Sequence, residues 1–430
     1  MSSPVPHLVL LGSCILLLAG CATYHPDPDP NALFIQRAQI KESGKLRVSV
    51  AVPTRDEAKA YLGVDVERHK IQPIWVRVEN GEDDQFVLLP LSADPDYFSP
   101  AEAAWKNHKF LRGRINRKMD FLFDDQQVPI LIEPGETVEG LIYTNWTKGL
   151  KYVEIDLRGE KSTHFVHFAI EIPGAKLDYQ EVDFDGLYPL DEIREVDDAG
   201  LKAYLEALPC CALGGDRKTP ADPLNIVVVA PQDSLGPPFL RRGWMVTETI
   251  RTSTVLGTIA SSLFGRVYKN SPVSALYLYD RPQDVALQKA RETVDERNHL
   301  RLWLSPIRWN GQLVWVGQIS RDIGVRLTRK TITTHKIDPD TDEARFYLVQ
   351  DLASSGSLAR MGYAAGVGGA SRYAPRKNYT GDPYYTDGLR VAFFLSADYV
   401  DFDEVDWIES WERPGDHIHH RTAPAPEGGD

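Results

Sequence analysis

The sequence predicts a mixed α+β protein, in which an N-terminal immunoglobulin-like β-sandwich precedes a mixed α/β-sheet domain. Two observations predict this. Residues 46–175 contain short segments of alternating apolar and polar residues separated by turn-forming residues. Residues 201–411 alternate helix-like and strand-like segments around a nearly continuous apolar run at 224–230. The chain has 430 residues, of which 43% are hydrophobic, so it can build two cores.

The N-terminus has the features of a bacterial lipoprotein signal. The apolar run from Leu8 to Leu18 is too short to cross a bilayer, which needs about 20 residues. It ends in Leu18-Ala19-Gly20-Cys21, the pattern of a lipobox. We expect residues 1–20 to be a signal peptide and Cys21 to carry palmitate-type acyl chains. The region before Leu8 lacks Lys and Arg, so an ordinary secretory signal is the alternative.

Residues 21–45 are predicted to form a stalk between the lipid and the folded protein. Pro26, Pro28 and Pro30 favour an extended polyproline conformation there. Ala22 follows the lipidated Cys, which favours the outer membrane over retention at the inner membrane. We therefore expect the protein at the cell envelope, on the periplasmic face of the outer membrane.

The net charge limits the kinds of partner that the protein can bind. The net charge of −13 argues against nucleic acid. The expected partners are the membrane, through the N-terminal lipid, and an envelope protein or a small ligand, and the sequence does not identify a cofactor. Cys210 and Cys211 are adjacent, and we expect two buried thiols, with a disulfide between them as the alternative.

The sandwich begins with alternating strands at 46–52 and 74–78, and Asn80-Gly81 provides a turn. Ser99 followed by Pro100 and Glu102 predicts the start of a helix. Further strands are expected at 138–144, 152–157 and 165–172.

The acidic residues 176–200 are predicted to be a linker, and residues 412–430 a disordered tail. Between them, Leu201, Leu205 and Leu208 have helical spacing that Pro209 ends. Strands are then expected at 224–230, 244–247, 275–280, 299–309, 313–319 and 391–395, and helices at 235–242, 255–264 and 339–352.

Four stretches resemble the LssY C-terminal domain family. They are Leu224 to Ala230 with Arg242-Gly243-Trp244, Arg297 to Trp303, Val314 to Gly317, and Thr334 to Arg345. The resemblance covers about residues 198–397 and implies context rather than a reaction. In that family the domain often follows membrane-embedded modules of DedA or phosphatidic-acid-phosphatase type, and it is associated with type I secretion. Here a lipid anchor and a sandwich are expected in their place.

One candidate site lies on a predicted hairpin that closes at Asn310-Gly311. Arg297, His299 and Arg301 alternate with leucines, so they share one face of a strand. If Arg308 pairs with Leu313, His299 lies opposite Asp322 and Arg301 opposite Ser320, although a bulge at Pro306 could shift this register.

In the catalytic interpretation of that hairpin, Asp322 orients His299 as a general base. Arg297 and Arg301 bind an anion. The alternative is a polar sheet face on the protein surface, held by salt bridges.

A second candidate site consists of His335, Asp338, Asp340 and Asp342, a pattern of possible metal ligands. It is not an EF-hand, because Glu343 and Val349 occupy the positions of the required Gly and Glu. The alternative is that Asp338 caps a helix whose first residue is Pro339, followed by acids at the positive end of the dipole.

Two functions are compatible with these patterns. The first is a membrane-anchored envelope lipoprotein whose second domain is a binding or accessory module, related to secretion or to the envelope. The second is a metal-assisted hydrolase of envelope phosphate or lipid substrates.

Overall fold

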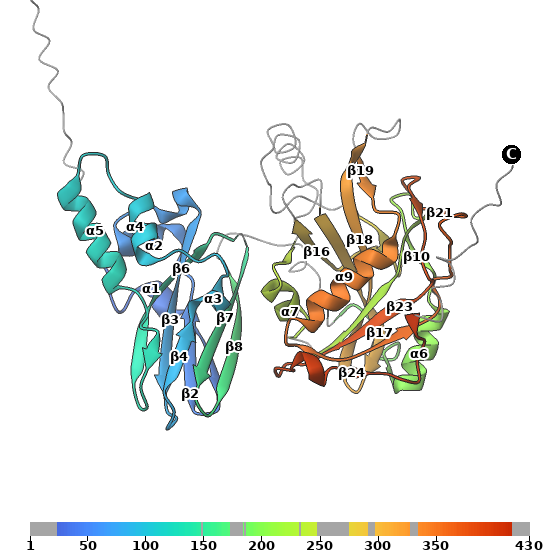
Figure 1. Cartoon of the computed structure of the whole chain (residues 1–430), viewed down its shortest axis with the longest axis horizontal. Coiled ribbons are helices and arrows are strands. Elements are labelled where there is room, and N and C mark those ends of the chain that lie inside the picture. The colour runs from blue at the N-terminus through green and yellow to red at the C-terminus, as the bar shows by residue number, and fades with distance from the viewer. Residues whose placement is uncertain are drawn as a thin grey trace, which may run out of the picture. The chain divides into compact units, whose positions relative to one another are not determined.

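The computed structural model describes residues 24–147, 149–172, 184, 186–231, 234–246, 275–290, 297–326 and 334–414. The chain divides into two compact units, residues 1–146 with 159–161, and residues 147–158 with 162–430 (Figure 1). With 22% helix and 41% strand, and one sheet curled into a half-barrel, the predicted mixed class is confirmed. Among the described residues, no helix combines the length and apolar character needed to span a membrane.

The first unit is built on an antiparallel sheet in the order β1-β2-β3-β6, in which Val48 and Val50 of β2 are buried. Its strands are β1 Gln39–Ser43, β2 Leu46–Ala51, β3 Ile71–Asn80 and β6 Thr137–Asn145. Strand β4 Phe86–Leu89 pairs antiparallel with β5 Leu131–Ile132 in the same unit. Strands β7 Leu150–Gly159 and β8 Thr163–Glu171 form a separate antiparallel pair, and nearly all of their residues belong to the second unit. The immunoglobulin-like arrangement of these strands stays a prediction.

Helices cover one side of the β3–β6 pair, where Trp75 and Tyr143 pack against Phe34, Leu62 and Phe123. The helical segments are α1 Leu33–Gln36, α2 Arg55–Leu62, η1 Val66–His69, α3 Pro90–Ala93, α4 Pro100–Lys106 and α5 Gly113–Asp125 (Figure 1). The helix expected after Ser99 is α4, and the Ser99 hydroxyl accepts a hydrogen bond from the Glu102 amide at 3.2 Å. Helices α2 and α5 were not predicted from the sequence.

The stalk prediction is wrong for residues 24–45. Phe34 is only 1% exposed, and β1 pairs with β2 from Gln39 onward. The Asp27 amide also donates to the carbonyl of Ala60 at 3.1 Å. Burial of Phe34 and the hydrogen bonds between β1 and β2 hold this segment on the folded unit. Its prolines do not prevent this. Cys21 and the signal peptide lie outside the described residues.

The second unit contains a ten-stranded sheet, in which β13-β16-β17-β18-β12-β23-β20-β24 are neighbours, β19 pairs with β18 and β9 pairs with β17. Its centre is β12, which runs antiparallel to β18 and parallel to β23. The strands are β9 Arg194–Val196, β12 Ile226–Ala230, β13 Met245–Val246, β16 Val285–Ala290, β17 Arg297–Trp309, β18 Gln312–Arg326, β19 Thr334–Ile337, β20 Leu358–Ala364, β23 Arg390–Leu395 and β24 Asp406–Trp407.

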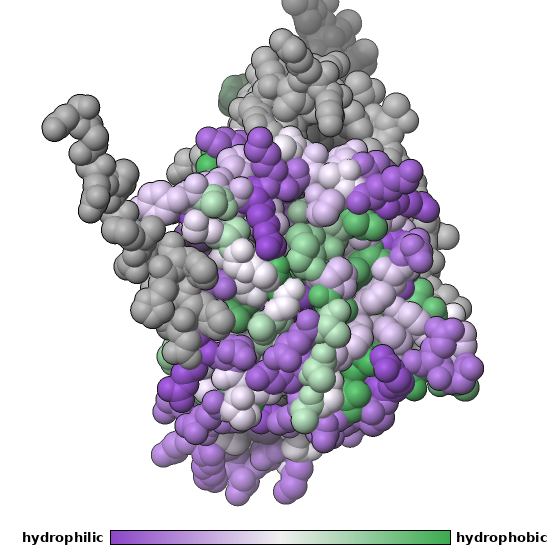
Figure 2. Space-filling view, turned by 90° about the vertical axis from the view of Figure 1, so that its right-hand side faces the viewer, coloured by the Kyte–Doolittle hydropathy of each residue, from purple (hydrophilic) through white to green (hydrophobic). Residues whose placement is uncertain are grey.

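Both faces of this sheet are covered. Val228 joins a core with α9, whereas Val227 and Val229 join a second core with α6. Thus the apolar run at β12 does form a strand buried on both faces. The other elements are α6 Asp198–Ala207, α7 Gly236–Arg241, α9 Thr341–Ala353, η3 Phe402–Glu404, the sheet β11-β10-β14-β15 with β10 Cys211–Leu213, β11 Pro220–Pro223, β14 Tyr277–Leu278 and β15 Arg281–Pro282, and the pair β21 Arg376–Lys377 with β22 Pro383–Tyr384. Figure 2 shows hydrophilic residues along the margins of one face of the molecule and more apolar residues near its centre.

The linker prediction is wrong for residues 186–200. Strand β9 pairs in parallel with Ile307–Trp309 of β17, and the Tyr188 hydroxyl donates to the Leu304 carbonyl at 2.7 Å. The first residue of the predicted C-terminal tail is also part of the fold, because the Glu412 amide donates to the Tyr363 carbonyl at 2.9 Å. The rest of the predicted tail, from residue 415, and the helix predicted at 255–264 lie outside the described residues.

Candidate functional site

Strands β17 and β18 form the predicted hairpin. Asn310 and Gly311 have φ angles of 47° and 75°, the left-handed conformations of a two-residue type I′ turn. Arg308 pairs with Leu313, as the turn predicts. The local sequence signal was sufficient here because such a turn depends on two adjacent residues.

The register farther along the hairpin differs from the prediction. The ladder is interrupted between Leu304 and Arg308, so His299 lies opposite Ser320 and Arg301 opposite Gln318. Pro306, which lacks an amide hydrogen, lies within this bulge. The shift is an even number of residues, so the side chains keep the faces that their alternation predicted.

The polar face of this hairpin is buried, which contradicts the interpretation of a surface face. Arg297, His299 and Arg301 are 3%, 5% and 7% exposed, while the alternating leucines pack into the core beside α9. On the partner strand, Gln318, Ser320 and Asp322 are also buried. We call these six residues, together with Gln288 of β16, the hairpin cluster.

His299 and Asp322 are in direct contact in the hairpin cluster, although they are diagonal rather than opposite neighbours. Nε2 of His299 hydrogen bonds with Oδ2 of Asp322. The Arg297 Nε atom is 3.0 Å from the same imidazole nitrogen and 3.6 Å from the carboxylate. The Arg297 guanidinium thus lies against both the imidazole and the carboxylate, and its positive charge compensates the charge of Asp322.

The remaining charges of the hairpin cluster are also compensated. Arg297 donates to Gln288 Oε1 at 2.6 Å, and Arg301 donates to Gln318 Oε1 at 2.8 Å. Arg301 interacts electrostatically with Asp222 of β11, which accepts a hydrogen bond from Asn378 at 2.9 Å. Burial raises the pKa of the Asp222 carboxyl and lowers the pKa of the Arg301 guanidinium. Two arginines thus face two aspartates away from water.

The second predicted cluster lies at the start of α9. Asp338 accepts a hydrogen bond from the Asp340 amide, and Asp340 is the N-cap that accepts from the Asp342 amide. The helix therefore begins at Thr341 rather than at Pro339, and the cap is Asp340 rather than Asp338. His335 belongs to β19, but its side chain lies outside the described part of the structure.

Asp342 has a different role from the two aspartates before it. Its carboxylate accepts from the Thr386 hydroxyl and the Asp387 amide, both at 2.7 Å, and lies 3.6 Å from Arg345. Burial raises the pKa of Asp342. Within the described ranges, no three His, Cys, Asp or Glu residues are grouped to hold a metal ion. The hydrogen bonds of these aspartates instead organise the helix start and the loop at Asp387.

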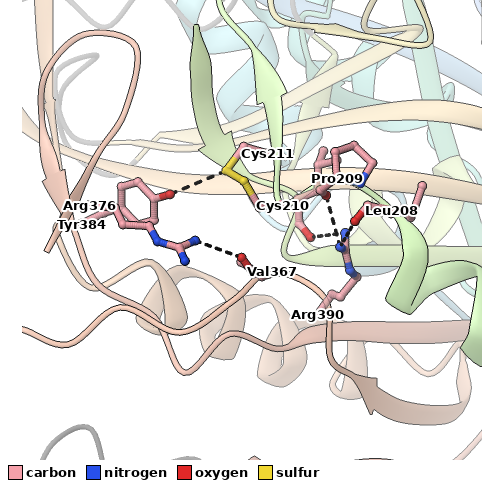
Figure 3. The surroundings of a disulfide bond; sticks show 9 residues. Leu208, Pro209, Cys210, Cys211, Val367, Arg376, Tyr384 and Arg390 are labelled. Carbon is pink, nitrogen blue, oxygen red and sulfur yellow. Dashed lines mark hydrogen bonds between the residues drawn. A yellow bond between two sulfur atoms is a disulfide. The ribbon is translucent and has the colours of Figure 1, made fainter.

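Cys210 and Cys211 form a disulfide, so the prediction of two thiols is wrong (Figure 3). Cys211 is buried, and its Sγ atom is 3.6 Å from the Tyr384 hydroxyl. Beside the disulfide, Arg390 donates to the carbonyls of Leu208, Pro209 and Leu224 at 3.0–3.2 Å. Arg390 was missed by the sequence reading, as were Gln288, Gln318 and Asp222, because only the folded chain brings these separate segments together.

Residues 205–389 match the protein family described as LssY C-terminus. The matched region includes the hairpin cluster and the start of α9. No curated protein matches the chain.

Proposed function

Because residues 205–389 form a domain of the LssY C-terminus family, we propose that this domain is a binding or accessory module held at the cell envelope by an acylated Cys21. The immunoglobulin-like sandwich would act as its spacer, and the protein would lie on the periplasmic face of the outer membrane. The observation that carries the binding role is the internally compensated hairpin cluster.

The geometry of the hairpin cluster favours a structural role over catalysis. A general base must reach a proton of the substrate. His299 is 5% exposed, and its Nε2 atom is already bonded to Asp322. The arginines likewise direct their guanidinium groups to protein oxygens, at 2.6 Å for Gln288 and 2.8 Å for Gln318. Such a network fixes the relative positions of β16, β17 and β18, and so supports a rigid binding scaffold.

Acylation is tested by labelling cells with an alkyne analogue of palmitate. We expect label on the native chain and none on Cys21→Ser. Cys14→Ser is the matched control, because Cys14 lies in the predicted signal peptide and should not affect labelling. Equal labelling of the native chain and Cys21→Ser would overturn the anchor. Separation of the inner and outer membranes then tests the expectation from Ala22.

The second candidate is a metal-assisted hydrolase of envelope phosphate or lipid substrates, in which His299 and Asp322 would act as the base and its orienting carboxylate. The test is metal content and phosphatidic-acid hydrolysis for the native chain, His299→Ala and His335→Ala. The exposed His25→Ala provides the control. The binding role predicts no turnover in any of them. Turnover that is lost in His299→Ala but kept in His25→Ala would establish the hydrolase instead.

A further inference from the structure

The turn between α4 and α5 exposes an unusual group of large apolar side chains. Phe110 and Leu111 at the turn are 89% and 86% exposed, and Trp105 and Phe121 on the flanking helices are 72% and 73% exposed. Contiguous exposed apolar residues on a soluble surface mark interaction sites more often than single ones do. We call these residues, with the basic residues between 106 and 118, the α4–α5 surface.

The α4–α5 surface is also strongly basic. Six Lys or Arg residues occur between 106 and 118, and no Asp or Glu occurs from 103 to 119. The chain as a whole has a net charge of −13, so the charge of this surface is opposite in sign to that of the whole protein. The Lys106 Nζ atom is 3.5 Å from the Glu102 carboxylate, and His108 Nε2 is 2.6 Å from the Asp120 carboxylate. Lys109 and Arg114, which flank the apolar turn in the sequence, are exposed and add further positive charge. An anionic partner is the complement of such a surface.

Stability of the fold does not account for these residues. Leu111 has a φ of 55°, a conformation that costs a non-glycine residue about 1 kcal/mol. Helix α5 has no acidic residue in its first turn, where acids would complement the helix dipole, and Arg114 lies there instead. Phe110 and Leu111 gain almost no burial in return.

A cavity of about 300 Å³ lies beside the apolar turn. Its lining includes the basic residues Lys59, Arg68, His69, Lys106, His108 and Lys109. Asp65 also lines it, but its carboxylate is paired with Arg55 at 2.7 Å and Arg68 at 3.0 Å. The cations around this cavity could bind lipid phosphates, and the exposed aromatic rings beside it could contact the acyl chains below them. The surface is therefore complementary to an anionic membrane.

The N-terminal segment meets the fold at the same place. Gly63 lines the basic cavity, and a Cβ atom at Gly63 would lie 2.8 Å from the Tyr24 ring and 2.9 Å from the Pro26 nitrogen. The chain thus enters the first unit beside the α4–α5 surface, only a few residues after Cys21. An anchor at Cys21 would hold this surface close to lipid.

We propose that the α4–α5 surface docks on an anionic membrane. Phe110 and Leu111 insert at the level of the acyl chains, Trp105 lies at the interface, and the surrounding cations bind lipid phosphates. This contact does not require acylation of Cys21, so it goes beyond the proposed anchor.

The test uses the mature chain from residue 21 with Cys21→Ser, so that no acyl chain contributes. Co-sedimentation is measured with vesicles of phosphatidylcholine alone and of an equal mixture with phosphatidylglycerol. We expect binding to the mixed vesicles, a blue shift of Trp105 emission that Trp105→Phe removes, and weakening by salt.

Two sets of variants separate the apolar and charged contributions. Phe110→Ser with Leu111→Ser should lower the vesicle partition coefficient at least tenfold, whereas its control exchanges exposed apolar residues of the second unit, Leu190→Ser with Phe402→Ser. Each surface cation contributes about fivefold to binding, so Lys106→Gln, Lys109→Gln and Arg114→Gln together should cost about hundredfold. The matched control set is Lys161→Gln, Lys218→Gln and Arg372→Gln, and circular dichroism verifies that every variant is folded.

Equal losses in the control and test variants would overturn the proposal. So would an absence of binding to the mixed vesicles, which would favour a protein partner for this surface. Cys21 labelling has no influence on either outcome, so failure here is distinguishable from failure of the anchor.

Discussion

Replacement of Asp322 with Asn tests whether the hairpin cluster is held together by paired buried charges. Asp322 and Arg297 are each 3% exposed, and the guanidinium Nε lies 3.6 Å from the carboxylate. Removing one partner of a buried ion pair costs about 3–5 kcal/mol, because the other charge stays buried without compensation. Asn can still form a hydrogen bond with His299, so we expect a loss near the lower end, about 3 kcal/mol.

A double-mutant cycle identifies the pair as the cause. Arg297→Met should cost a similar amount, because it leaves the Asp322 carboxylate buried without its cation. The double variant removes both charges, and we expect it to be no less stable than either single variant. The interaction free energy between the two sites should therefore be at least about 3 kcal/mol.

The assay is urea unfolding followed by tryptophan fluorescence, which reports mainly the second unit because six of the nine Trp residues follow residue 162. With an m-value of about 3 kcal/mol/M, a loss of 3 kcal/mol lowers the midpoint by about 1 M. A midpoint shift below a quarter of this value in Asp322→Asn, or strict additivity in the cycle, would refute the reasoning.

Two further predictions concern the N-cap of α2 and the disulfide. Arg37 holds the pKa of Glu57 at about 2, below its usual 4.5, so the ion pair stabilises the fold fully above pH 4.5 and is lost as the pH falls through 2. Because the Arg37 side chain is nearly half exposed, the ion pair contributes about 1 kcal/mol. In Glu57→Gln, the melting temperature of the first unit should therefore depend less on pH between 2 and 4.5 than it does in the native chain. For Cys210 and Cys211, the chain is denatured, alkylated and digested, and mass spectrometry of the peptide that contains both residues should find no label without reductant and two labels with it. Their closed loop is so short that Cys210→Ser with Cys211→Ser should cost only about 1 kcal/mol, and a loss of several kcal/mol would contradict the loop-entropy argument.

Local patterns predicted the elements whose causes are local. The Asn310-Gly311 turn, the helix start at Ser99 and the buried strand Ile226–Ala230 all follow from a few neighbouring residues. The same kind of signal is present at Thr54, where Thr-x-x-Glu forms a capping box with Glu57, although helix α2 was not among the predicted elements. Prolines misled the prediction of a stalk because they limit the backbone without excluding the burial of Phe34.

The sequence by itself determined which side chains of the hairpin share a face and that Arg297, His299 and Asp322 lie near one another, because strand alternation and a two-residue turn are properties of adjacent residues. Short motifs also indicated the resemblance to the LssY C-terminal domain family over about residues 198–397, and the family match covers residues 205–389. Only the tertiary structure decided that this polar face is buried, that the bulge near Pro306 sets His299 opposite Ser320, and that Asp222 from β11 balances Arg301. Burial and charge compensation depend on layers contributed by distant segments, and no local periodicity encodes which segment will cover which face.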